Sequence, residues 1–175
     1  MMQICSTFES LAFYRGMSDK YPTDRPSVVI PRRDRRPRNS STVFHEAADQ
    51  WFASCFGIPY RSHGVFLTSR PEAALAYAAS PAQVMRVVPM SPYTFCWSSK
   101  VSDLLFAAMT FADAPPDAIN AFLTDAGYQE DGLEAAHASG HEVMLSCERY
   151  LAVPVGLLGI SVTDGRPSLI VPAGT

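Results

Sequence analysis

The stretch from Gly64 to Ala79 brings together groups that can hold a phosphate-bearing ligand. Its apolar run Val65 to Leu67 predicts a short strand, and the hydroxyl residues Thr68 and Ser69 follow where that strand ends. Ser69 can cap a helix that has Pro71 in its first turn and continues through the alanines to the end of the stretch. Hydroxyl groups beside a helix N-terminus form a natural phosphate site. A capped helix after a core strand, without any ligand, is the alternative interpretation of the same residues.

A second chemically distinctive segment is a run of arginines early in the chain. Ser18 to Ser41 is rich in proline and has little periodicity, so we expect a long exposed loop with a short strand near Val28 to Ile30. Long loops without regular structure are often functional, and this one can engage an acidic protein surface or a nucleic acid. A solvated charge run without a partner is the other interpretation. The arginines are Arg32, Arg33, Arg35, Arg36 and Arg38.

Metal ligation finds little support in the sequence. The residue four after His45 is Asp49, so the zinc-protease HExxH pattern is absent and we interpret His45 as structural. We expect no metal site. The cysteines are widely separated and contain no CxxC pair, which favours reduced thiols in a cytosolic setting; they are Cys5, Cys55, Cys96 and Cys147.

Composition and periodicity indicate one globular domain over residues 1–175. The hydrophobic fraction is 47%, the charged fraction is 18% and the formal net charge is −3, so the chain as a whole does not favour nucleic-acid binding. The start of the chain does not have the pattern of a signal peptide, and no apolar run is long enough to span a membrane. We therefore expect a cytoplasmic protein with no membrane partner. A protein delivered into a host or target cell by a specialised secretion machine would look the same.

The predicted elements follow one another as in a mixed α+β domain, not as alternating βαβ units. We expect strands at 11–14, 65–67 and 83–89, two strands or one long bent strand within 141–155, and a hairpin over 160–171 that turns at Asp164 and Gly165. Helices are predicted at 43–56, 71–79, 102–112, 115–126 and 132–138, and loops at 58–63 and 92–100.

Three short motifs in this order resemble those of the mono-ADP-ribosyltransferase family of the arginine–serine–glutamate type. They are Phe13-Tyr14-Arg15-Gly16, then Gly64-Val65-Phe66-Leu67-Thr68-Ser69 with Tyr77 in the following helix, and Gly140-His141-Glu142-Val143-Met144-Leu145. The family has an aromatic-Arg-Gly on its first strand, a Ser-Thr-Ser strand before a helix, and a glutamate at the start of a later strand. The resemblance implies split mixed β-sheets with flanking helices, and NAD as the substrate.

The resemblance also implies a role for each motif residue. Glu142 would hydrogen-bond the ribose and stabilise the positive charge that develops as nicotinamide leaves. Arg15 would bind the pyrophosphate through its planar fork, and Gly16 would leave room for the backbone to hold the nicotinamide amide. Thr68 and Ser69 would brace the catalytic carboxylate and the ribose. Tyr77 would pack near the nicotinamide.

Two departures from the family pattern keep other functions open. Leu67 replaces the first serine of Ser-Thr-Ser, and Gly140 stands two residues before Glu142, where arginine-modifying members carry a second acid and asparagine-modifying members a glutamine. Glu148 is a rival carboxylate further along the chain. The expected function is transfer of ADP-ribose to a protein or nucleic acid by a bacterial or phage toxin or effector. The alternatives are an RNA 2′-phosphotransferase-like enzyme and an inactive binding module of the same fold.

Overall fold

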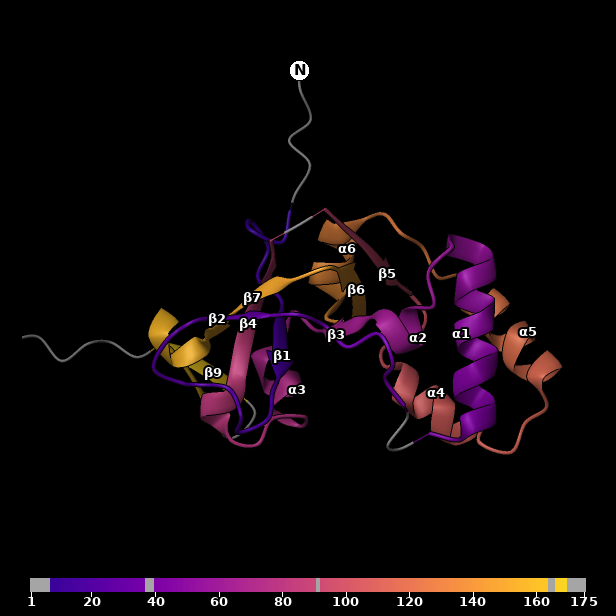
Figure 1. Ribbon diagram of the computed structural model, residues 1–175, viewed down its shortest axis with the longest axis horizontal. Helices are drawn as coiled ribbons and strands as arrows, with labels where there is room; N and C mark the ends of the chain where they lie inside the picture. The colour runs from indigo at the N-terminus through magenta and orange to yellow at the C-terminus, as the bar shows by residue number, and fades with distance from the viewer. Residues whose placement is uncertain (1–6, 37–39, 91, 164–165, 170–175) are drawn as a thin grey trace, which may run out of the picture.

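Two antiparallel sheets carry the three sequence motifs (Figure 1). The computed structural model describes residues 7–36, 40–90, 92–163 and 166–169. One sheet has the strand order β1-β4-β7-β2 and the other the order β3-β6-β5. Strands of the first sheet are β1 (Tyr14–Gly16), β4 (Val84–Pro89), β7 (Tyr150–Pro154) and β2 (Ser27–Val29). Strands of the second are β3 (Val65–Leu67), β6 (Val143–Cys147) and β5 (Tyr93–Trp97).

The architecture is α+β, as the sequence predicts, but the expectation of mixed sheets is wrong. Every strand pair within the described residues is antiparallel. A separate hairpin of β8 (Ile160–Thr163) and β9 (Arg166–Leu169) confirms the predicted pairing near the end of the chain. Its predicted turn, Asp164 and Gly165, lies outside the described residues.

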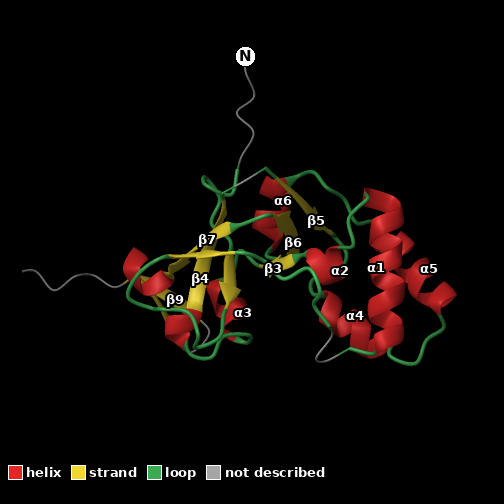
Figure 2. Ribbon diagram, in the orientation of Figure 1, coloured by secondary structure: helices red, strands yellow, loops and turns green. Residues whose placement is uncertain are grey.

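The helices gather mainly on one side of the three-stranded sheet, where α1, α4 and α5 lie together (Figure 2). Ser41 accepts a hydrogen bond from the Phe44 amide at 3.1 Å and caps α1, and Gly57 ends it in the left-handed conformation at φ 74°. The apolar residues Phe44, Ala47, Ala48 and Phe52 recur at helical spacing along α1 and are buried, whereas Trp51 is half-buried and Cys55 is exposed. The helices are α1 (Thr42–Phe56), α2 (Tyr60–His63), α3 (Pro71–Leu75), α4 (Leu104–Thr110), α5 (Pro116–Ala126) and α6 (Leu133–Ser139).

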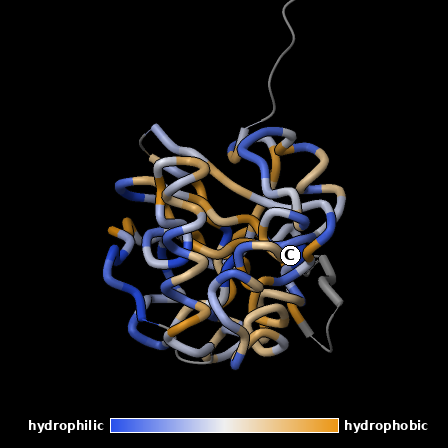
Figure 3. Tube along the Cα trace, turned by 90° about the vertical axis from the view of Figure 1, so that its right-hand side faces the viewer, coloured by the Kyte–Doolittle hydropathy of each residue, from blue (hydrophilic) through white to orange (hydrophobic). Residues whose placement is uncertain are grey.

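Two large apolar clusters hold these elements together. The first lies between the sheets and includes Phe13, Leu67 and Tyr150; the second packs α1, α4 and α5 against the other side of the three-stranded sheet and includes Phe52 and Leu104. Figure 3 shows hydrophobic segments toward the middle of the trace and hydrophilic ones along much of its outer edge. Burying each large apolar side chain contributes about 1.5–3 kcal/mol, so both clusters fix where the strand ends lie.

Three local predictions were wrong. Residues 92–100 are not a loop: Tyr93–Trp97 forms β5, whose aromatic residues pair with β6 from Tyr93 opposite Cys147 to Trp97 opposite Val143. Residues 60–63 form the one-turn helix α2. The helix after β3 ends at Leu75, because the chain then turns and the Ala79 amide donates to the Met17 carbonyl at 3.0 Å.

The first strand is also displaced, since β1 begins at Tyr14 and not at Leu11. The other predicted helices and strands are present within one or two residues of their expected bounds. None of the helices in the described part of the chain is both long and apolar enough to cross a membrane.

Candidate functional site

The first and second motifs are joined by backbone hydrogen bonds. The Tyr14 amide donates to the Thr68 carbonyl at 2.7 Å, and the Thr68 amide donates to the Tyr14 carbonyl at 3.0 Å. Arg15 therefore follows immediately after the residue that contacts the end of β3. This bridge also connects the two sheets.

The third motif lies on the other side of the second. Leu67 is paired with Val143, so the hydroxyl residues after β3 lie beside the residues before β6. The Thr68 hydroxyl donates to the Gly140 carbonyl at 3.2 Å, and the Ser69 hydroxyl donates to the His137 carbonyl at 2.7 Å. Because each hydroxyl has one proton and that proton is used, both oxygens can only accept hydrogen bonds from a ligand. The structure thus brings all three motifs together, while Ser69 does not cap α3 as predicted.

Gly16 has a packing role that the sequence did not predict. A Cβ atom at this position would collide with the carbonyl oxygen of Ala74, the amide nitrogen of Ala78 and the backbone of Tyr77. The glycine therefore lets β1 approach the segment that carries Tyr77, and the predicted site residues Gly16 and Tyr77 are in contact.

Two further arginines converge on this region from separate segments. Arg35 donates to the Gly64 carbonyl at 2.9 Å, and its guanidinium carbon lies 4.6 Å from the centre of the Phe66 ring. The Arg61 guanidinium lies 5.4 Å from the same ring, and its buried Nε has no hydrogen-bond partner in the described part of the chain. Burial, followed by repulsion from Arg15 and Arg61, lowers the pKa of Arg35 to about 10. Three cations therefore lie within electrostatic reach of one another, which favours an anionic ligand.

This geometry corrects the interpretation of the arginine run as one exposed group. Arg35 is turned into the site, whereas Arg32 is exposed and pairs with Asp34, two residues along the chain, at 3.2 Å. Arg33 and Arg36 are also exposed. Arg38 lies outside the described residues. Within the described part of the run, Arg32, Arg33 and Arg36 remain candidates for contact with a large acceptor.

Glu142 is the carboxylate at the centre of the site. Its backbone amide donates to the Ser102 carbonyl at 2.9 Å, and its Oε1 accepts from the Leu104 amide at 3.3 Å. Burial, and after it the negative charge of Asp103, raise the pKa of Glu142 to about 7, although Arg61 and Arg35 oppose this shift. A carboxylate that titrates near neutral pH and feels the charges of two arginines, Arg61 and Arg35, is typical of a functional site.

Tyr77 lies close to this carboxylate, as part of the predicted set. Its hydroxyl donates to Asp103 Oδ2 at 2.8 Å, while the residue as a whole is 57% exposed. Burial of the hydroxyl, then the hydrogen bond and charge of Asp103, and finally the charge of Glu142 raise the pKa of Tyr77. Tyr77, Asp103 and Glu142 therefore form one polar group at the edge of the site.

The two departures from the family pattern have structural causes. Leu67 is 2% exposed and belongs to the core between the sheets, so a serine there would bury a hydroxyl. Gly140 ends α6 at φ 70°, and the Arg70 side chain fills the space that a side chain at position 140 would need. The rival carboxylate Glu148 is exposed and lies at the opposite end of β6 from Glu142.

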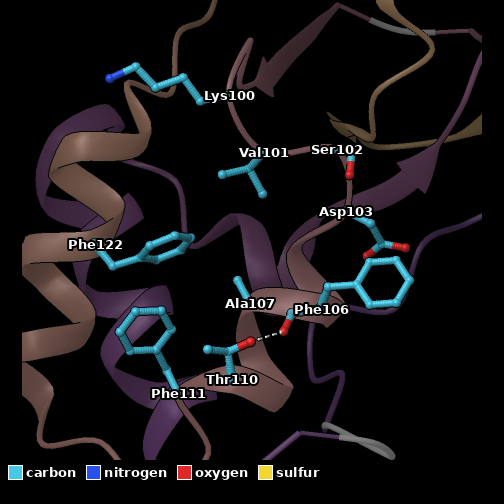
Figure 4. A pocket seen from close by; sticks show the side chains of 9 residues that line it. All are labelled: Lys100, Val101, Ser102, Asp103, Phe106, Ala107, Thr110, Phe111 and Phe122. Carbon is cyan, nitrogen blue, oxygen red and sulfur yellow. Dashed lines mark hydrogen bonds between the residues drawn. The ribbon is translucent and has the colours of Figure 1, made fainter.

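A shallow hollow of about 280 Å³ lies beside the polar group, between α4 and α5. Figure 4 shows Asp103 and Phe106 together at one side of it, apart from Phe122. Asp103 caps α4 through the Leu105 amide at 2.7 Å. Sequence reasoning missed Asp103 and Arg61 as site residues. An aspartate before the apolar run Leu104-Leu105 is a helix-cap signal, but nothing local marks Arg61.

His45 and the cysteines are not members of this polar group, although the charges of Arg61 and Arg35 reach His45. His45 is buried in α1, with its Nε2 4.0 Å from Asp49. Cys96 and Cys147 are buried free thiols, Cys55 is an exposed free thiol, and Cys5 lies outside the described residues.

Comparison of the chain with models of known protein families, with curated proteins and with solved structures found no match.

Proposed function

We propose that this protein has an ADP-ribosyltransferase-like fold and transfers ADP-ribose from NAD to a macromolecular acceptor, a protein or a nucleic acid, as a toxin or effector. The observation that carries the proposal is the convergence of Arg15, the Thr68-Ser69 pair and Glu142 on one place, although they lie far apart in the sequence. Arg35 and Arg61 add two cations to that place.

Each residue type has a role that fits this reaction. Planar guanidinium groups match phosphate oxygens through paired hydrogen bonds, so Arg15, Arg35 and Arg61 would bind the pyrophosphate of NAD. Loss of nicotinamide leaves positive charge on the ribose, and the ionised Glu142 carboxylate would stabilise that charge. The Ser69 oxygen would accept a hydrogen bond from a ribose hydroxyl, because Ser69 donates its own proton to the His137 carbonyl.

The fraction of Glu142 that is ionised follows from its environment. With a pKa of about 7, roughly half of the carboxyl groups are ionised at neutral pH in the free protein. Bound pyrophosphate would partly neutralise the arginines that now stabilise the carboxylate. Activity that depends on ionised Glu142 should therefore rise with pH near neutrality.

A transfer assay tests the proposal. Purified protein is incubated with NAD labelled in its adenylate phosphate and with cell lysate, and labelled macromolecules are detected after separation. We expect labelling with the wild type, a loss of about 10²-fold or more with Glu142→Gln, and wild-type labelling with Glu148→Gln. Equal labelling by the wild type and Glu142→Gln would refute the proposed role of Glu142.

The second candidate is the RNA 2′-phosphotransferase reaction, which requires a more basic pocket. Arg15, Arg35 and Arg61 would supply this basic character, in addition to binding the pyrophosphate of NAD. An oligonucleotide with one internal 2′-phosphate distinguishes the two functions. NAD-dependent loss of that phosphate supports the second candidate, whereas labelled macromolecules with an intact 2′-phosphate support the first. Binding of NAD without any turnover would support the inactive binding module.

A further inference from the structure

Arg35 and Arg61 are partly buried without an acidic partner in the described part of the chain. Their guanidinium groups lie 4.6 and 5.4 Å from the centre of the same Phe66 ring. Neither forms an ion pair with a carboxylate of the described residues, and the buried Nε of Arg61 has no hydrogen-bond partner among them. Buried charges in proteins are normally paired, so two unpaired cations with a free donor indicate a site for an anion.

Arg61 extends from α2 toward the beginning of α1. Its Nη2 donates to Ser40 Oγ at 3.3 Å, and Ser40 directly precedes Ser41, the N-cap of α1. Asp49, an acid of α1, accepts from the Ser62 amide at 3.0 Å and forms no ion pair with Arg61. This contact holds α2 against α1, and Figure 1 shows α2 between β3 and that helix. Arg61 therefore reaches the start of α1 with its charge unbalanced.

The start of α1 supplies further hydrogen-bond donors. The first amides of a helix have no partner within the helix, and Ser41 Oγ accepts only from that of Phe44. The amides of Thr42 and Val43 donate to no group in the described part of the chain, and both residues are exposed. The first turn also has no acidic residue to balance the positive end of the helix dipole. A 15-residue helix with this beginning favours an anion there.

A buried histidine one turn into α1 gives independent support. His45 is 9% exposed, and its Nδ1 has no hydrogen-bond partner among the described residues. The charges of Arg61 and Arg35 both act on its ring, so it lies near the two guanidinium groups. Buried polar atoms in folded proteins almost always have a partner. Polar atoms of α1 and α2 that lack one thus gather beside the same pair of arginines.

We propose that Arg61, Ser40 and the first amides of α1 form a phosphate-binding subsite, with Arg35 beside it. The guanidinium fork and the backbone amides together match the several oxygens of a phosphate group. Ser40 can also donate to that group, because its oxygen accepts from Arg61 and its own proton remains available. The inference goes beyond the proposed function, since phosphate binding at this place requires no cleavage of NAD.

Two sources supply such a phosphate. Arg35 feels the charges of both Arg15 and Arg61, so a pyrophosphate can extend from the first motif to the start of α1. The charge of Arg61 also acts on Glu142, so a phosphate of a nucleic-acid acceptor bound at Arg61 would lie near the carboxylate. Both ligands use the same donors, and the experiment below distinguishes them.

The test uses the whole chain and inorganic phosphate as the probe. Val43→Glu places a carboxylate in the first turn of α1, where it favours the helix but repels phosphate. Gln50→Glu adds the same charge at an exposed position further along this helix and is the matched control. Thr42→Pro removes one of the two amides; proline suits the first helical position, and Ser41 already has the extended conformation, with ψ 149°, that proline requires of the residue before it.

A second pair of variants tests the cation. Arg61→Gln removes the charge from the subsite, and Arg25→Gln removes an exposed charge that is paired with Asp24. Thermal unfolding without phosphate verifies that each variant is folded. Amide-resolved NMR then follows the titration with phosphate, so that the residues that respond and the dissociation constant come from one experiment.

We expect phosphate to shift the amide signals of Thr42 and Val43 in the wild type. The dissociation constant should rise at least about 10-fold in Val43→Glu and Arg61→Gln, and it should also rise in Thr42→Pro. It should stay unchanged in Gln50→Glu and Arg25→Gln. A merely structural role for Arg61 would not make Val43→Glu differ from Gln50→Glu.

ADP-ribose and a single-stranded oligonucleotide with a 5′-phosphate distinguish the two sources. Weaker binding of ADP-ribose by Val43→Glu than by Gln50→Glu assigns the subsite to the pyrophosphate. Weaker binding of the oligonucleotide by Val43→Glu, with ADP-ribose bound equally by both variants, assigns it to a nucleic-acid acceptor. Either result supports the subsite.

Two results would overturn the subsite. One is a titration in which phosphate leaves the amide signals of Thr42 and Val43 unchanged, and the other is equal phosphate affinity of folded Val43→Glu and Gln50→Glu. Both are read without NAD, so they leave the proposed function untouched. A protein that binds phosphate at these amides but does not cleave NAD would refute the proposed function and retain the subsite.

Discussion

Replacing Arg35 with alanine should damage both the fold and anion binding, whereas the same change at Arg36 should damage neither. These neighbours in the chain have opposite environments. Arg35 is partly buried over Phe66 and bonded to the Gly64 carbonyl, and Arg36 is exposed. The pair therefore compares a cation in the site with a cation in solvent at adjacent positions of one loop.

The structure gives the size of the effect. A hydrogen bond from a charged donor contributes about 1.5–3 kcal/mol, and a cation over an aromatic face about 0.5–2 kcal/mol. Relief of the repulsion from Arg15 and Arg61 offsets part of this loss. We expect Arg35→Ala to lower the free energy of unfolding by about 1–3 kcal/mol and Arg36→Ala to change it by less than about 0.5 kcal/mol.

Urea denaturation measures the stability, and calorimetric titration with NAD measures binding. Loss of one charged contact to phosphate should weaken NAD binding about 10- to 150-fold in Arg35→Ala. Arg36→Ala should bind NAD as the wild type does, with weaker transfer to a macromolecular acceptor only if the exposed arginines contact it. Equal effects of the two substitutions on stability and NAD affinity would refute the assignment of Arg35 to the site.

Three other predictions test the geometry of the site. Gly16→Ala should destabilise the fold by about 1–3 kcal/mol or more because the added Cβ collides with the backbone at the end of α3 and just after it, whereas Gly156→Ala places its Cβ in open space and should be tolerated. Urea denaturation of the two variants measures the difference, and equal stabilities would contradict the prediction. Glu142→Gln should be more stable than the wild type by up to about 3 kcal/mol at pH 8 but not at pH 4.5, because the pKa of Glu142 is about 7 in the folded protein and 4.5 ordinarily, so the wild type loses stability as pH rises from 4.5 to 7. A stability difference that does not change with pH would contradict this. Ser69→Ala should lower the free energy of unfolding by about 1 kcal/mol because it loses the hydrogen bond to the His137 carbonyl, whereas Ser54→Ala, on an exposed helix surface, should lower it by less than about 0.5 kcal/mol. Thermal unfolding of the two variants measures the difference.

Local signals were sufficient for the elements whose ends are marked in the sequence. Ser41 and Gly57 mark both ends of α1, and its buried residues recur with helical spacing. Gly127 likewise marks the end of α5 in the left-handed conformation. The alternating apolar residues of β4 and β6 identified them as strands. These features depend on neighbours within a few positions, which is why sequence reasoning found them.

Elements that depend on distant partners could not be found in this way. β5 is a strand because its residues pair with β6, far along the chain, and its aromatic composition alone also suits a loop. The helix α3 ends early because the Ala79 amide pairs with Met17, which no local pattern encodes. Backbone hydrogen bonds between segments far apart in the chain decided both outcomes.

The same distinction applies to the candidate site. Arg15, Ser69, Tyr77 and Glu142 could be selected from motifs, and strand pairing brings their segments together. The separation of Arg35 from its exposed neighbours could not be predicted, because it depends on the position of Phe66 and the Gly64 carbonyl.

The most direct test of the proposed function is the release of nicotinamide from NAD by the purified protein, followed by proton NMR between pH 5 and 9. We predict release by the wild type with a rate that rises around pH 7, at least about 10²-fold slower release by Glu142→Gln, and wild-type rates for Glu148→Gln. No release by the wild type, or undiminished release by Glu142→Gln, would contradict the central claim that Glu142 and the surrounding arginines form an NAD-cleaving site.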